Sequence, residues 1–390
     1  MAEAQAHRRG RGPEGNGGYP VSALATAAPS RRQGARHGTR SPVAGGRDRY
    51  LDALRALALV RVVTYHTFVW AWLSLAFPSM GVMFALAGSL MARSLERPAL
   101  PVLRGRLRRL LPPLWLFAAV VVLAMMIHGW APTAHHIGSW WTAMLLWVVP
   151  VGDPPGSAWA SQATDILWYL HTYLWLVLLS PLLLRVFRLS PVVVLCLSLV
   201  PIVVLQTVWA PPDNDAGTVA TDVATYVTCW LLGFAHRDGL LERLRTGPAL
   251  VIAVPVMAAG GWWAFHHLQD GTYDLNNIPV AQALWSAGFV MVLLGFRPKM
   301  DWVGRIRPLE RLIGIFNARA VTIYLWHEVA LVLSVPLIDA MWQVTAFELS
   351  LPLGSTWFQF GVTWVLVAVA VMLFGWLEDI AARRRPMLLP

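Results

Sequence analysis

Long apolar segments recur along the chain from residue 50 onward, separated by short stretches that carry charges, glycines and prolines. An α-helix rises about 1.5 Å per residue, so about 20 apolar residues cross the hydrocarbon core of a bilayer, which is about 30 Å thick. Each segment must be helical, because lipid offers no partner to free backbone N–H and C=O groups. The pattern predicts about ten spanning helices, near residues 51–75, 78–95, 111–129, 164–184, 190–209, 222–236, 248–266, 279–296, 319–338 and 356–377.

A further apolar stretch, Ser139 to Val151, is shorter, and charge decides whether it crosses. Lys and Arg are enriched on the cytoplasmic side of membrane proteins, so the Arg-rich connections are assigned to that side. They all fall there only if this stretch does not cross, which predicts a re-entrant or interfacial segment. Both termini are then cytoplasmic in a multi-pass protein of the cell membrane. The inner segments are the N-terminal tail, 97–109, 185–188, 237–245, 297–311 and 383–385.

Composition agrees with a membrane protein. Hydrophobic residues make up 57% of the 390 and charged residues only 13%, too few to solvate a folded body of this size. We therefore predict an all-α fold, a polytopic membrane helix bundle over residues 49–386. Residues 1–48 are rich in Arg, Gly, Ala, Pro and Ser and predict a disordered basic cytoplasmic tail. This tail supplies much of the net charge of +10. A basic tail before a first span is typical of an orientation signal near anionic lipid, so no nucleic-acid partner is expected.

Candidate chemistry lies among ionisable groups in the membrane, because the sequence has no glycine-rich phosphate loop, zinc signature or nucleophile elbow. Arg55 and His66 in the first span are eleven residues apart, about 20° beyond three helical turns, so they share one face about 16 Å apart along the axis. An anionic ligand entering one cavity from the cytoplasm could anchor on Arg55 and present its reactive end to His66. The alternative is that Arg55 snorkels to the interface and His66 only bonds a neighbouring helix.

A basic cluster leads straight into the third span. Arg106 and Arg109 fall on one helical face, and planar guanidinium groups suit phosphate oxygens. Pro112 and Pro113 are expected to mark the start of a helix. Basic residues also flank most inner helix ends, so this cluster alone could be an orientation signal only.

Aromatic residues surround two more intramembrane histidines, in the fourth and ninth spans. They could line an acyl or acceptor pocket, although an interfacial aromatic belt is preferred for His171. The acidic pair Glu378 and Asp379 near the inner end of the last span could partner Arg groups. The possible pocket residues are Tyr324, Trp326, His327, Trp168, His171 and Glu378. No metal site is expected, because adjacent histidine pairs such as those at 135–136 and 266–267 rarely complete one.

Together these residues resemble the acyltransferase-3 family of polytopic membrane O-acyltransferases. The family's first span carries an Arg or Lys followed by a His, matched by Arg55 and His66. Its basic motif at the third span is similar to Arg106–Pro113, and its Tyr-Leu-Trp-His motif to Tyr324–His327. Its closing acidic residue is similar to Glu378. The resemblance covers roughly residues 48–386. The chain departs from the family in the fourth span, where His171 and Tyr173 stand near a position that is often acidic.

The resemblance implies transfer of an acyl group, commonly acetyl, from cytoplasmic acyl-CoA to a hydroxyl of a sugar, glycan or related acceptor. Acyl-CoA, commonly acetyl-CoA, is then a co-substrate, and no bound cofactor is expected. The family also implies that His66 acts in catalysis and that Arg55, Arg106 and Arg109 hold the donor. An imidazole is well matched to a general base near neutral pH, although covalent attack by His66 stays open.

Two other classes of protein are compatible with parts of the pattern. A secondary transporter or flippase also has about ten spans with intramembrane charge, but it predicts internal repeats and interrupted helix pairs, which the sequence does not show. A membrane scaffold without activity leaves the aligned Arg55 and His66 unexplained.

Overall fold

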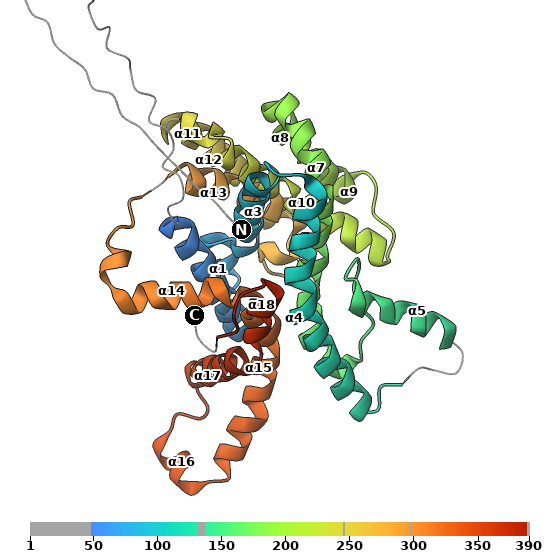
Figure 1. Cartoon of the computed structure of the whole chain (residues 1–390), viewed down its shortest axis with the longest axis vertical. Helices are drawn as coiled ribbons and strands as arrows, with labels where there is room; N and C mark the ends of the chain where they lie inside the picture. Colours follow the sequence, from blue (N-terminus) through green and yellow to red (C-terminus); the bar gives the residue numbers. More distant parts are fainter. Residues whose placement is uncertain (1–47, 132–136, 245, 297, 388–390) are drawn as a thin grey trace, which may run out of the picture. The chain divides into compact units, whose positions relative to one another are not determined.

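The computed structural model describes residues 48–131, 137–244, 246–296 and 298–387. These residues form helices and hold no β-strand, apart from an isolated bridge between Gln269 and Thr272 (Figure 1). Seven helical stretches in the described part are long and apolar enough to cross a membrane, and 191–207 and 279–295 are shorter apolar helices. The predicted all-α polytopic bundle is confirmed. Nearly all of the predicted N-terminal tail, together with the histidine pair at 135–136, lies outside the described residues.

Each predicted apolar segment overlaps at least one helix, although several bounds differ. The first nine are α1 (Arg49–Phe68), α2 (Trp72–Ala76), α3 (Ser79–Ser94), α4 (Ala99–Ile127), α5 (Ile137–Val148), α6 (Ser161–Thr164), α7 (Trp168–Leu189), α8 (Pro191–Leu197) and α9 (Val200–Thr207). The others are α10 (Asp215–Arg237), α11 (Leu240–Arg243), α12 (Thr246–His266), α13 (Pro279–Gly295), α14 (Arg307–Ala318), α15 (Ala320–Trp342), α16 (Thr345–Ser350), α17 (Thr356–Phe374) and α18 (Trp376–Ala381).

Helix α1 carries the ionisable residues of the first span. The Asp48 side chain caps it by accepting hydrogen bonds from the backbone N–H groups of Tyr50 and Leu51. The helix ends at Phe68, because Val69 adopts a left-handed conformation with φ of 51°. The prediction of one span over 51–75 was therefore wrong at its C-terminal end, where the chain turns into α2 and α3.

Helix α4 corrects a second expectation. Pro112 and Pro113 were predicted to start a helix, but α4 begins at Ala99 and continues through both prolines to Ile127. Two backbone hydrogen bonds are lost there, which membrane helices tolerate when neighbouring groups serve the freed carbonyls. One continuous helix therefore carries both the Arg residues of this segment and the membrane span.

Helix α5 corresponds to the short segment that was predicted not to cross. Its 12 residues span about 18 Å, too short for a bilayer core. Indole N–H groups fasten its C-terminal end and the loop that follows: Trp115 donates to the Val148 carbonyl at 2.8 Å and Trp175 to the Val151 carbonyl at 2.9 Å. The C-terminal end of the segment is therefore held by α4 and α7, while the rest of α5 projects from the bundle (Figure 1).

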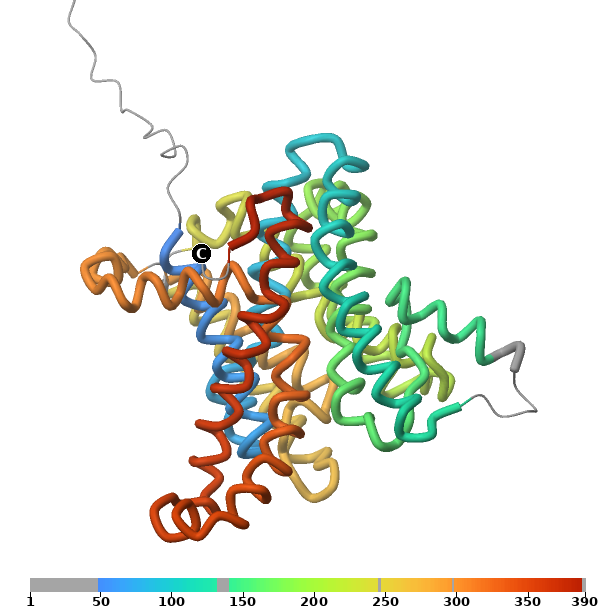
Figure 2. Tube along the Cα trace, turned by 60° about the horizontal axis from the view of Figure 1, so that its bottom comes forward, coloured from blue at the N-terminus to red at the C-terminus, as the bar shows by residue number. Residues whose placement is uncertain are grey.

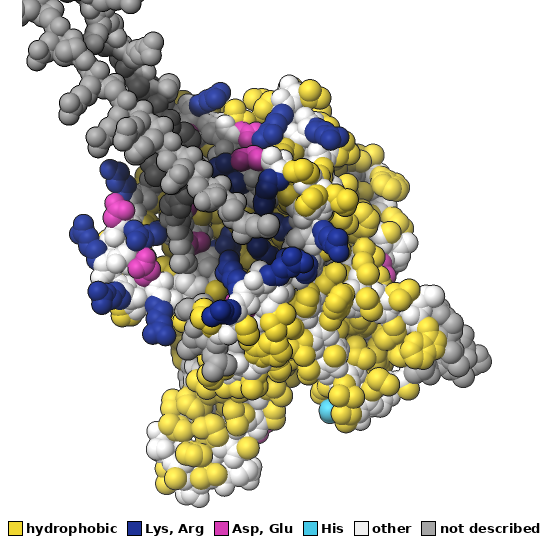
Figure 3. Space-filling view, viewed as in Figure 1, with side chains coloured by type: hydrophobic (Ala, Val, Ile, Leu, Met, Phe, Trp, Pro, Cys, Tyr) yellow, Lys and Arg dark blue, Asp and Glu magenta, His cyan; other side chains and the backbone are white. Residues whose placement is uncertain are grey.

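Both ends of the described chain lie at the same end of the bundle. Arg49 at the start of α1 pairs with Glu310 of α14 at 3.2 Å, and Arg319, between α14 and α15, donates to the Met387 carbonyl at 2.7 Å. Figure 2 shows α14 and α18 at this end and α16 at the opposite one. Lys and Arg side chains gather on the face that carries α11, α14 and α18 (Figure 3). That this end is cytoplasmic stays a prediction from the positive-inside rule.

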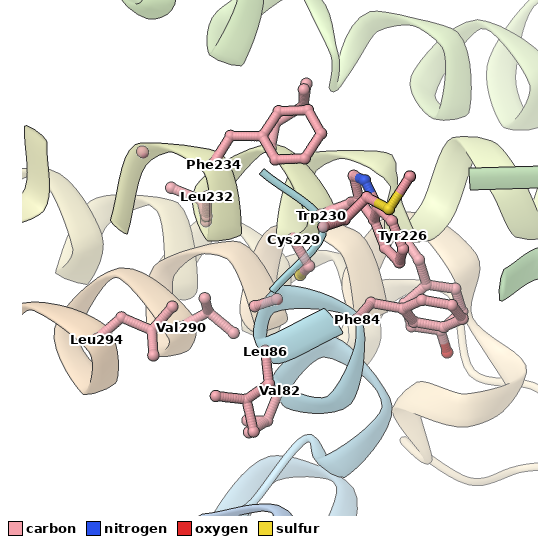
Figure 4. Close-up of a cluster of buried hydrophobic side chains, with 14 of the residues drawn as sticks. Val82, Phe84, Leu86, Tyr226, Cys229, Trp230, Leu232, Phe234, Val290 and Leu294 are labelled. Carbon is pink, nitrogen blue, oxygen red and sulfur yellow. The ribbon is translucent and has the colours of Figure 1, made fainter. Parts of the chain in front are cut away.

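The tightest packing joins α3 and α10, with α13 beside them. Side chains from all three helices form one buried apolar cluster, in which Trp230 is fully buried (Figure 4). The backbones approach closely where Gly88 of α3 faces Trp230 and Gly233 of α10 faces Ala85, since an added Cβ at either glycine would overlap the carbonyl oxygen of the facing residue. Small residues permit such approaches between membrane helices.

We expect Gly233→Leu to destabilise the protein strongly, because the side chain would force α3 and α10 apart. Overpacking typically costs about 1–3 kcal/mol, and here the obstacle is backbone. The measurement is the melting temperature and the monodisperse yield in detergent. Gly361→Leu on α17 is the matched control, since a Cβ there meets no heavy atom within 4 Å. Equal stability of the two variants would contradict this packing.

Candidate active site

Two cavities that contain charged side chains lie in the bundle, and Tyr324 of α15 lines both. One, of about 330 Å³, contains four guanidinium groups and is called the arginine cavity. The other, of about 450 Å³, contains His66 and is called the histidine cavity. The Tyr324 hydroxyl donates to the Ile166 carbonyl at 2.7 Å, which fixes the ring in the wall between them.

The arginine cavity brings together the basic residues that the sequence singled out. Arg55, Arg106 and Arg109 line it, with Arg384 from the C-terminal segment. Two of them donate hydrogen bonds to uncharged groups: Arg55 Nη1 donates to Asn317 Oδ1 at 2.9 Å, and Arg106 Nη2 donates to the Leu90 carbonyl at 3.2 Å and to the Ser94 hydroxyl at 3.1 Å. A cluster of guanidinium groups in a cavity suits a multiply charged anion such as a phosphate ester.

Two adjacent carboxylates, Glu378 and Asp379, line the arginine cavity, and both bind residues at the start of α15 or just before it. Glu378 accepts hydrogen bonds from the Thr322 backbone N–H at 2.8 Å and hydroxyl at 2.6 Å, at the first turn of α15. Burial raises the pKa of Glu378 to about 7, while the Thr322 bonds act in the opposite direction. Asp379 accepts from Arg319 at 2.6 Å, and that bond lowers the Asp379 pKa. The expectation that Arg groups partner this acidic pair therefore holds for Asp379, whereas Glu378 caps a helix.

The histidine cavity contains an imidazole held by a carboxylate. Nδ1 of His66 is in direct contact with Oε1 of Glu328. The Glu328 side chain is 1% exposed, whereas His66 is 35% exposed and lines the cavity. A carboxylate on one ring nitrogen fixes the orientation of an imidazole and leaves Nε2 for another partner. The pair therefore has the arrangement of a general base and the group that orients it.

His327 lies behind this pair. Its ring centroid is 5.1 Å from that of His66, and its Nδ1 donates to the Tyr324 carbonyl at 2.6 Å. The ligand atoms of His66, His327 and Glu328 all lie within 4.8 Å of one another, so this group could hold a metal ion, which the sequence did not suggest.

The other predicted pocket residues divide between the cavities and the helix packing. Trp168 lines the histidine cavity and Glu378 the arginine cavity. His171 is fully buried: its Nε2 lies 3.1 Å from Asp222, which lines the histidine cavity, and its Nδ1 lies 3.2 Å from Asp153. Trp326 lines neither cavity, because its ring stacks on Phe374 with centroids 4.3 Å apart.

The structure also corrects the relation between Arg55 and His66. They were predicted to share one cavity along one stripe of the first span, but α1 presents Arg55 to the arginine cavity and His66 to the histidine cavity. Glu328, which directly follows His327 in the sequence, was not among the predicted site residues. The sequence could have indicated this residue, because a carboxylate inside a membrane span beside a histidine is a candidate functional group by default. No pattern in the sequence pointed to Asp222.

A helical membrane bundle that holds a carboxylate–imidazole pair in one cavity and a guanidinium cluster in the next has the parts of a membrane-embedded group-transfer enzyme. The chain belongs to the acyltransferase-3 family: the family model, described as an acyltransferase domain, matches residues 48–377, nearly the whole chain. No curated protein and no solved structure matches it. The protein is therefore a multi-pass membrane acyltransferase, and the transporter and scaffold alternatives lose their support.

Proposed function

We propose that the protein moves an acyl group, commonly acetyl, from cytoplasmic acyl-CoA to a hydroxyl of a sugar, glycan or related acceptor. The observation that carries this proposal is the shared wall at Tyr324, with phosphate-binding chemistry on one side and the His66–Glu328 pair on the other. The phosphates of the donor bind in the arginine cavity, and the acyl thioester extends past Tyr324 towards His66.

The reaction needs one base and one acid, and His66 serves as both in turn. Its Nε2 takes the proton of the acceptor hydroxyl while the hydroxyl oxygen attacks the thioester carbonyl carbon. A carbon–oxygen bond forms and the carbon–sulfur bond breaks, so the electron pair leaves on the CoA sulfur. The imidazolium then returns the proton to that sulfur, and Glu328 stabilises the charged ring in between.

The two substrates enter from opposite ends of the bundle in this proposal. The arginine cavity includes residues of α18 and the C-terminal segment, at the end assigned to the cytoplasm. The histidine cavity includes Asn276, Asn277 and Thr218, which adjoin connections predicted to lie outside. Its lining of amides, carboxylates and Trp168 is typical of carbohydrate sites, where polar groups bind hydroxyls and an indole covers the ring.

The direct test is to incubate purified protein in nanodiscs with radiolabelled acetyl-CoA and a panel of glycosides. We expect label in the glycoside, with stoichiometric release of free CoA. Label that stays on the protein would instead indicate an acyl-enzyme. Release of CoA without labelled glycoside, at a rate equal to that of the His66→Ala variant, would contradict the proposal.

Substitutions in the arginine cavity should weaken donor binding. We expect Arg106→Gln and Arg109→Gln each to raise the KM for acetyl-CoA about tenfold or more, because a charge-assisted hydrogen bond contributes about 1.5–3 kcal/mol. The KM for the acceptor should change little. Arg104→Gln is the control on the same helix, since Arg104 is exposed and does not line the cavity. Equal increases in this KM for the variants at 104, 106 and 109 would show that the basic residues act only through general surface charge.

A further inference from the structure

Arg61 is a buried cation that the proposed reaction does not use. It lies on α1, lines the histidine cavity and is only 7% exposed. Its Nε and Nη2 atoms are buried and have no hydrogen-bond partner among the described residues. Burying such donors without partners costs about 1–3 kcal/mol or more, so the position calls for an acceptor that comes from outside the chain.

The contacts around Arg61 leave one edge of its guanidinium group without a partner among the described residues. The Arg61 Cζ lies 4.8 Å from the ring centroid of Tyr65, a cation–π contact that uses the face of the guanidinium group. The Tyr65 hydroxyl donates to Asp274 Oδ2 at 2.5 Å, so the ring is fixed in turn. Nε and Nη2 form the side edge of the group, which binds two oxygens of one carboxylate or phosphate at once.

Neighbouring carboxylates are already engaged. Asp222 faces His171 and Glu328 faces His66. Asp274 accepts hydrogen bonds from Tyr65 and from the Asn276 backbone and side-chain amides. Asp165 adds another carboxylate to the lining, which would favour a cationic acceptor. An experiment must therefore distinguish an anionic acceptor from a cationic one.

A second buried polar side chain with an unpartnered atom, Gln282, lines the same cavity and indicates which other group the ligand carries. Gln282 is 2% exposed, and its Oε1 has no hydrogen-bond partner among the described residues. Its Nε2 donates weakly to the Tyr226 hydroxyl at 3.4 Å, which orients the amide. The free oxygen requires a donor, such as a sugar hydroxyl. The cavity thus offers a fork for an anion and an acceptor for a hydroxyl.

We propose that the acceptor is an acidic sugar, whose carboxylate or phosphate binds the Arg61 fork while a hydroxyl is presented to His66. This inference rests on the proposed acyl transfer and specifies its acceptor. Arg61 is then a specificity-determining residue, because it binds the acceptor at a point remote from the reacting oxygen.

The test compares four para-nitrophenyl glycosides that share one aglycone: the glucoside, the glucuronide, a glucoside phosphorylated on the primary hydroxyl, and the glucosaminide. In wild-type protein with acetyl-CoA, we expect kcat/KM for at least one acidic glycoside to exceed that of the glucoside about tenfold or more. The better of the two distinguishes carboxylate from phosphate. A preference for the neutral or the amino sugar would overturn the proposal.

Arg61→Gln should abolish this preference by raising the KM for the acidic glycoside, with little change for the neutral one and for acetyl-CoA. Arg61→Lys keeps the charge but loses the fork and should retain part of the preference. Arg106→Gln, in the other cavity, should keep the preference while raising the KM for acetyl-CoA. An equal loss for all glycosides in Arg61→Gln would show a structural role and overturn the inference.

Binding without turnover separates this inference from the proposed function. The glucuronide, the phosphorylated glucoside and the glucoside are added to wild-type protein in nanodiscs, and the melting temperature is measured. Stabilisation by an acidic glycoside alone, without acylation of any glycoside, supports Arg61 as an anion site and removes the proposed transfer to sugars. Acylation without any charge preference in binding or turnover retains the transfer and removes this inference. Neither variant needs to fold for these wild-type comparisons.

Discussion

Replacing His66 with alanine is expected to abolish acyl transfer while the protein still inserts and binds acyl-CoA. General-base catalysis by a positioned side chain contributes about 10²–10⁴-fold, and no other imidazole lines the histidine cavity among the described residues. The donor should still bind, because the basic groups proposed to hold it line the arginine cavity. The measurements are the rate of labelled product formation and the affinity for acetyl-CoA by calorimetry.

His128→Ala is the matched control for this variant. His128 lies at the C-terminal end of α4, is exposed and stacks on Trp159 with ring centroids 3.9 Å apart, so its loss should leave transfer unchanged. Unchanged turnover in His66→Ala would remove His66 from the chemistry. Loss of acetyl-CoA binding together with activity would instead mean that the two cavities form one donor site.

Helical periodicity was enough to place the principal residues on the correct elements. The apolar segments predicted where helices lie, and Arg55 and His66 are on α1 as the sequence indicated. Arg106 and Arg109 meet in one cavity because residues three apart share a helical face. These features follow from local spacing and from the cost of exposed backbone in lipid.

The division into two cavities depends on contacts that spacing does not encode. Arg55 is held by Asn317, 262 residues away, and Tyr324 of α15 lines both cavities. Helix α15 also shows that residues of one motif can serve different purposes, since Trp326 packs against Phe374 while Tyr324 borders both cavities. Which face of a helix meets which neighbour is decided by packing across the whole bundle.

Glu328→Gln is expected to lower kcat by about 10²–10⁴-fold, nearly as much as loss of His66 itself. The carboxamide has almost the same shape but no charge, so it cannot stabilise the imidazolium that forms when His66 takes the acceptor proton. Its NH₂ group can also face Nδ1, which would select the tautomer with the proton on Nε2 and block the base. The KM for acetyl-CoA should stay within a fewfold of wild type, because Glu328 lines the other cavity.

A double variant tests whether Glu328 acts through His66. If the carboxylate only orients and stabilises the imidazole, His66→Ala with Glu328→Gln should be no slower than His66→Ala alone, since groups that act as a unit are not additive. Asp165→Asn is the control within the same cavity, because Asp165 lines it without an ion pair to His66, and its effect should add to that of His66→Ala. Additive losses for Glu328 would show that the carboxylate contacts a substrate directly. The Glu328 side chain is 1% exposed and the His66 side chain 35% exposed, so a substrate reaches the imidazole more readily than the carboxylate. This difference favours the non-additive result.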